Sequence, residues 1–181
     1  MKYLISFLLL LILSASSCKK NKTGEQLPPE TQEGKFTIGF KVDGKVYTAK
    51  GKGGLLSSES VTYGLLADDN SINIFASNSS ASKPKFHLTL IVHYKGAQGI
   101  YEMKNYPYQG TFMDGQDGTI PGSNNVFKTS ETYNGKVNIN FFNGSLPALN
   151  GTILSGTFEM DAVNGEGKVI HITDGRFDIG H

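Results

Sequence analysis

The stretch of sequence that decides the fold is residues 36–50, which reads FTIGFKVDGKVYTAK. In its first half every second residue is apolar: Phe36, Ile38, Phe40 and Val42. This period of two is typical of a strand with one buried face. Asp43-Gly44 follows and is a strong hairpin signal, so residues 45–50 are expected to form the partner strand. The segment therefore predicts an antiparallel hairpin.

The same alternation returns along the rest of the chain. A strand after Asn134-Gly135 is expected to turn Val137, Ile139 and Phe141 inward, and Asp174-Gly175 is expected to be a turn. Further strands are expected at 61–67, 72–76, 86–94, 100–103, 154–162, 169–173 and 176–179. No mature segment has a convincing helical period. Residues 35–181 are therefore predicted to form a single antiparallel all-β domain, a β-sandwich or a barrel-like sheet.

One long irregular segment, residues 105–125, interrupts this pattern. Loops of that length in compact domains are either functional or poorly ordered. Its aromatic residues Tyr106, Tyr108 and Phe112 are the candidate binding residues, because aromatic rings give contact area at low entropic cost. The alternative is that these rings fold inward and cap an open end of the sandwich. As a binding site they would take a glycan or an envelope protein.

Upstream of the domain, residues 1–18 read as a secretion signal. Lys2 precedes an apolar run at 4–13, and small residues then lead into Cys18. A cysteine after such residues resembles the lipobox of bacterial lipoproteins, which implies a signal peptide at 1–17 and a lipid on Cys18. The alternatives are a transmembrane anchor, for which about ten apolar residues are too few, and an ordinary cleaved signal. The expected membrane partner is therefore a bilayer reached through Cys18.

Residues 18–34 are predicted to be the lipidated cysteine and a disordered tether. The segment is polar, contains Pro28-Pro29 and has no apolar periodicity. Sixteen residues of flexible coil would span roughly 20 to 25 Å.

Charge and cysteine content exclude several classes of function. The chain has a formal net charge of +1, and Lys2 leaves with the signal, so the mature protein is neutral. A neutral surface gives no electrostatic basis for binding nucleic acid. Because Cys18 is the only cysteine, its lipidation leaves no thiol for a disulfide, a zinc–thiolate site or a nucleophile.

The other chemical candidates give no catalytic, metal or cofactor site. His87 and His93 share a face of one expected strand, but six residues place them about 20 Å apart. His171 alternates with isoleucines and should point outward. The stretch Asp114-Gly115-Gln116-Asp117-Gly118 is rich in oxygen ligands but lacks the register of an EF-hand, so solvated turns are favoured over calcium. The sequence contains no nucleophile elbow, zinc-protease motif or P-loop.

Three segments carry a family resemblance. They are VDGKVYTA at 42–49, ILSGTFEM at 153–160 and VIHITDGRFD at 169–178. Together with the lipobox they resemble a group of small Bacteroidota cell-envelope lipoproteins built on a domain of unknown function. The resemblance implies a β-sandwich-like fold and an envelope location, and it implies no reaction.

The predicted function is that of a non-catalytic cell-envelope lipoprotein that binds a ligand or partner. The lipid anchor is expected in the outer membrane on the periplasmic face, because Lys19-Lys20 replaces the acidic run that resembles surface-export signals. The alternative is a glycan-directed hydrolase of the envelope. That function would need two carboxylates about 5 to 9.5 Å apart in a cleft.

Overall fold

The computed structural model describes residues 26–66, 70–115, 123–144 and 151–181. These residues contain eleven strands, one short 3-10 turn at Ser123–Asn125 and no α-helix. The all-β prediction is therefore confirmed. The strands are β1 (Thr37–Val42), β2 (Lys45–Lys50), β3 (Glu59–Leu66), β4 (Ser71–Asn78), β5 (Phe86–His93), β6 (Gly99–Met103), β7 (Gly110–Asp114), β8 (Val126–Lys128), β9 (Gly135–Phe142), β10 (Ile153–Val163) and β11 (Val169–Gly180).

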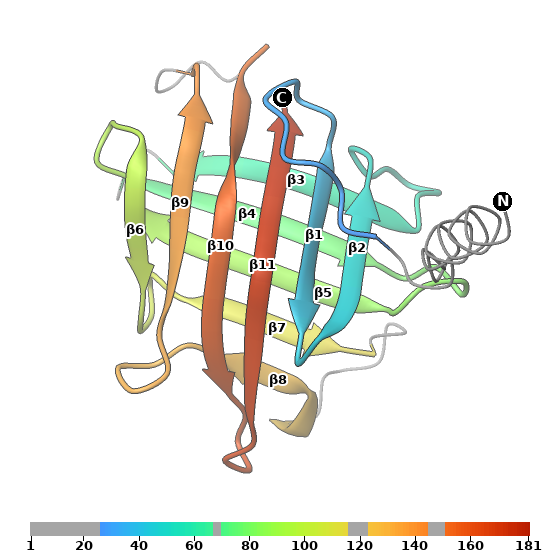
Figure 1. Cartoon of the computed structure of the whole chain (residues 1–181), viewed down its shortest axis with the longest axis vertical. Coiled ribbons are helices and arrows are strands. Elements are labelled where there is room, and N and C mark those ends of the chain that lie inside the picture. The colour runs from blue at the N-terminus through green and yellow to red at the C-terminus, as the bar shows by residue number, and fades with distance from the viewer. Residues whose placement is uncertain (1–25, 67–69, 116–122, 145–150) are drawn as a thin grey trace, which may run out of the picture.

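All strands belong to one antiparallel sheet that is nearly closed and barrel-like. Its main path runs β2-β1-β11-β10-β8-β7-β5-β4-β3, and β9 joins β10 to β6. Figure 1 shows a front layer of β6, β9, β10, β11, β1 and β2. Behind it, β3, β4, β5, β7 and β8 run across the front strands. The core lies between the two layers.

Aromatic rings fill much of this core. The Phe40 ring is fully buried and meets four other rings at centroid distances of 5.1 to 5.9 Å. Those rings are Tyr47, Phe86, Phe112 and Phe158. They come from both layers, so the inward face of the opening hairpin holds the layers together.

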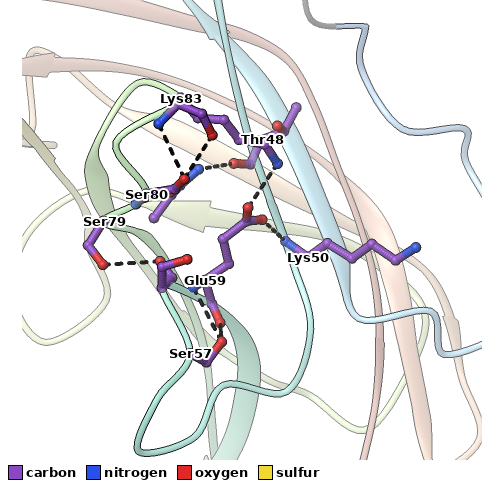
Figure 2. Close-up of polar contacts among 10 residues, drawn as sticks. Thr48, Lys50, Ser57, Glu59, Ser79, Ser80 and Lys83 are labelled. Atoms are coloured by element: carbon purple, nitrogen blue, oxygen red, sulfur yellow. Dashed lines mark hydrogen bonds and ion pairs between the residues drawn. The ribbon is translucent and has the colours of Figure 1, made fainter.

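A polar seam between β2 and β3 brings the two ends of the sheet together (Figure 2). The Val61 amide donates to the Gly51 carbonyl at 2.8 Å. The Glu59 carboxylate accepts from the Lys50 amide at 2.8 Å and from the Lys83 ammonium at 2.9 Å. These bonds give partners to a few backbone groups where β2 ends and β3 begins, at two strand edges that are otherwise not paired with each other.

The expected turn at Asp174-Gly175 is wrong. These residues lie inside β11, which is one strand of twelve residues. The register with β10 shifts there, and Asp174 has a φ of +54°. The dipeptide is therefore a β-bulge within a continuous strand. A Cβ on Gly175 would lie 2.5 Å from the Phe158 carbonyl oxygen, so this position has no room for a side chain.

A second bulge corrects the expected orientation of Phe141. Phe141 of β9 pairs with Ser155 of β10, and Ile139 pairs with the next residue, Gly156. Asn140 therefore has no opposing residue. One extra residue exchanges the two faces of the strand beyond it. Val137 and Ile139 are buried as predicted, but Phe142 packs against the core in place of Phe141.

The segment expected to be one long loop contains a strand. Strand β7 pairs with β5 on one side and β8 on the other. Gly110 begins it close to Met160, whose Sδ would lie 2.2 Å from a Cβ at that position. Residues 116–122 of this segment, with most of the calcium candidate, lie outside the described residues.

Residues 26–35 form a strap across the outer face of the front layer, which differs from the expected disordered tether. In Figure 1 the strap crosses in front of β1 and β11 before the chain turns back into β1. Pro28 lies so close to Gly39 that a Cβ there would be 2.3 Å from the Pro28 Cδ. The tether prediction for residues 18–25 lies outside the described residues.

Candidate functional site

The three predicted binding residues do not form one patch. Phe112 is 1% exposed, packs on Phe40, Tyr47 and Phe127, and is a core residue. Tyr106 is 82% exposed, in the connection between β6 and β7. Tyr108 is half-buried with its ring 5.1 Å from that of His93. Phe112 is therefore corrected from a binding residue to a structural one, because inward alternation in β7 buries it.

The histidines lie on outward faces, as predicted. His87 and His93 alternate with the buried residues of β5, and His171 is exposed on β11. Among the described residues, no group of three or more His, Cys, Asp or Glu side chains is arranged to hold a metal ion. Cys18 lies outside the part of the chain that the structure describes.

Asp178 fastens the strap to the front layer. This residue of β11 points outward, yet it is 1% exposed because the strap covers it. Its carboxylate accepts hydrogen bonds from the Thr31 hydroxyl at 2.5 Å and from the amides of Glu33, Gly34 and Lys35 at 3.1, 2.8 and 3.4 Å. A buried carboxylate needs such donors to offset its lost hydration. The strap is thus held by a specific polar contact.

A hollow of about 540 Å³ lies beside the strap. Strap residues 30–33 form one wall, and Asn140, Ser155, Gly156 and Phe177 form the rest. We call this hollow the strap pocket. The wall presents carboxylates, amides and hydroxyls, which suit a ligand rich in hydrogen-bonding groups.

Ser155 is the unusual residue of the strap pocket. It is 2% exposed, and its hydroxyl has no hydrogen-bond partner among the described residues. A buried polar group left unpaired costs about 1–3 kcal/mol. A ligand group that reaches this hydroxyl would recover part of that free energy.

Two further hollows continue from the strap pocket along the outer face of β10. The middle hollow, of about 240 Å³, shares Glu30 with the strap pocket. The last hollow, of about 480 Å³, shares Lys136 and Glu159 with the middle one. All three open on the same face of the front layer. The structure thus offers a row of polar hollows as a candidate site, in addition to the exposed Tyr106.

In the hollows of about 240 and 480 Å³, charged side chains are paired with each other. Lys136 pairs with Glu159 at 3.0 Å, and the His171 Nδ1 lies 2.7 Å from the Asp161 carboxylate. The hydrogen bond and charge of Asp161 raise the pKa of His171 above its ordinary value. The Lys41 Nζ lies 2.8 Å from the Asp174 carboxylate, and its hydrogen bond and charge lower the pKa of Asp174.

Sequence reasoning missed the strap pocket. The signal that was available is a charged residue, Asp178, between Phe177 and Ile179, because a carboxylate inside an apolar run needs partners. Ser155 looks like any outward serine of a strand. The strap, from more than a hundred residues earlier in the chain, binds Asp178, which pairs with Ser155, and forms one wall of the pocket.

No known family model, curated protein or solved structure matches this chain. Across the described residues, no helix has both the length and the apolar character needed to cross a bilayer.

Proposed function

We propose that this protein is a non-catalytic, lipid-anchored module of the cell envelope that binds a hydroxyl-rich ligand, a glycan, in the strap pocket. The observation that carries the proposal is the buried, unpartnered Ser155 hydroxyl beside a polar hollow of glycan-binding size. Glu30, Gln32 and Asn140 offer further hydrogen-bonding groups at its rim. The membrane part of the proposal depends on the signal and Cys18, and on the resemblance to Bacteroidota lipoproteins.

The alternative of a glycan hydrolase has less support. Glu159 and Asp161 lie two residues apart on one face of β10, as a pair of catalytic carboxylates would. However, their side chains are 59% and 52% exposed, and each contacts a basic partner. Both carboxylates are therefore held in ion pairs at a solvent-exposed surface and are not free to act as the acid and base of a glycosidase. We therefore favour binding without catalysis.

Binding is tested on a glycan array, followed by titration calorimetry of the mature protein with each glycan that is retained. Asn140→Ala and Gln32→Ala are each expected to weaken binding by about 2- to 10-fold, the loss of one hydrogen bond. Gln98→Ala, at an exposed loop position, is the matched control and should leave affinity unchanged. Equal affinities for all three variants would place the ligand elsewhere.

The lipid anchor is tested by labelling cells with radioactive palmitate. The wild-type protein should take up the label, and Cys18→Ser should not, because the only thiol has been removed. The variant should also accumulate unprocessed or away from the membrane. Equal labelling of both proteins would refute acylation at Cys18.

A further inference from the structure

The turn between β2 and β3 carries two leucines that are completely open to solvent. Leu55 and Leu56 are 101% and 99% exposed. The Ser57 amide donates to the Gly54 carbonyl at 3.0 Å, which makes the leucines the two central residues of a β-turn. Gly, Pro, Asn and Asp usually occupy such positions. Two adjacent leucines at the tip of a turn therefore require an explanation.

The strap brings the chain to this side of the molecule. Pro28 packs on Gly39 of β1, and Gly39 pairs with Thr48 of β2. Strand β2 ends at Lys50, five residues before Leu55. In Figure 1 the strap likewise begins at the β2 side of the front layer.

The docked strap also shortens the reach between domain and membrane. Gln26, the first described residue, follows Cys18 by eight residues, which span at most about 29 Å in any conformation. A lipid on Cys18 would therefore keep Gln26 within that distance of the bilayer, and Leu27 and Pro28, which follow it, lie against Gly39 of β1. The two leucines follow β2, the edge strand next to β1.

Basic residues flank the turn. Lys50 and Lys52 are exposed, and Figure 2 shows the Lys50 side chain extending away from the polar seam. The nearby Glu59 carboxylate is already in contact with Lys83. The turn thus combines an apolar tip with positive charge, which suits the boundary between headgroups and acyl chains of an anionic bilayer.

We propose that the Leu55-Leu56 turn is a second membrane contact, which inserts its two side chains into the lipid surface below the domain. This inference rests on the proposed anchoring through Cys18. Its consequence is a fixed orientation: the anchor and the turn together hold the β2 side against the bilayer. The domain then cannot swing freely about its tether.

The test uses the mature chain with Cys18→Ser, so that acylation contributes nothing to binding. Vesicles of phosphatidylethanolamine and phosphatidylglycerol are floated with this protein. A second protein adds Leu55→Ser and Leu56→Ser, and its partition should fall at least about tenfold, since each leucine loses its burial in lipid. Ile100→Ser is the matched control. Ile100 is 66% exposed on β6, at the opposite edge of the front layer, and its loss should not change partition.

A labelling experiment gives an independent readout. With Cys18→Ser the chain has no cysteine, so Leu56→Cys provides a single site for an environment-sensitive dye. Its emission should shift to the blue on these vesicles, whereas a dye at Ile100→Cys should not shift. Circular dichroism and thermal melts establish that each variant is folded.

Three results would overturn the inference. These are no vesicle binding by the protein with both leucines, equal losses for the leucine and Ile100 variants, or a self-associated species that only the leucine variant loses. The last result would assign the turn to a second copy of the chain. Failure of palmitate labelling would instead refute the anchor, and the vesicle result would stand apart from it.

Discussion

Phe112 and Tyr106 show how differently two aromatic residues of one segment can be used. Six positions separate them, yet Phe112 is buried among three rings and Tyr106 is 82% exposed. The sequence around both is rich in Gly, Asp and Asn, which is why neither could be assigned to a strand. The decisive information is the pairing of β7 with β5 and β8, which no local pattern contains.

Replacing these two residues by alanine should therefore give opposite results. Phe112→Ala removes a buried ring and is expected to cost about 3–5 kcal/mol of unfolding free energy. Tyr106→Ala should change that free energy by no more than about 0.5 kcal/mol. Urea denaturation followed by circular dichroism measures both. A small loss for Phe112→Ala would contradict its place in the core.

His171 should titrate above its ordinary value of 6.5 because of its contact with Asp161. A histidine whose pKa rises on folding adds stability below the unfolded pKa, and that stability is lost as the pH rises through the folded pKa. The side chain is exposed, so solvent keeps the contribution small. In NMR titrations, Asp161→Asn should bring the pKa of His171 back toward 6.5. An unchanged pKa in this variant would show that Asp161 is not the cause.

At the scale of elements, the same dipeptide has two outcomes. Asp43-Gly44 joins β1 and β2 as predicted, whereas Asp174-Gly175 lies within β11. Both aspartates have positive φ, +48° and +54°, but only Gly44 follows with a positive φ, +84°, as a two-residue hairpin turn requires. The partner also differs: β10 continues alongside β11 past the bulge. Local sequence therefore located most strands, missed β7 and β8, and could not distinguish a turn from a bulge.

Asp178 should control whether the strap stays docked. Asp178→Asn keeps the shape of the side chain but removes the charge that four donors share, and its amide group would face those donors. We expect a loss of about 2 kcal/mol or more in stability. Hydrogen exchange at residues 33–35 should become much faster. Asp161→Asn, on an exposed site, is the control for charge loss, and unchanged exchange in Asp178→Asn would argue that packing alone holds the strap.

For the whole molecule, the class of fold followed from the sequence, and the candidate site did not. Alternation shows which residues of a strand are buried, so the strands near Phe40 and Leu88 could be predicted residue by residue. The strap pocket needs residues 30–33 to lie against β9, β10 and β11, a contact that depends on the complete three-dimensional arrangement. Tertiary contacts of this kind leave no periodic trace in a sequence.

The fragment 35–181 should still fold by itself into a β protein, because the core rings all lie within it. Without residues 26–34 it loses three of the four donors to Asp178, so we expect it to be less stable than the fragment 26–181. Far-ultraviolet spectra and thermal melts of the two fragments measure this difference. A helical spectrum would refute the autonomy of the domain, and identical melts would show that the strap contributes nothing.

The bonds to Asp178 also carry a consequence for the order in which the protein is made. The strap residues precede their partner by 143 to 147 positions, and β1 likewise pairs with β11. A chain delivered from its N-terminus must therefore emerge almost to the end of this domain before either contact can form. The proposed processing at Cys18 would fall within that time, before the strap docks. A chain that stalls before residue 178 keeps its strap exposed to proteases, so docking marks completed synthesis.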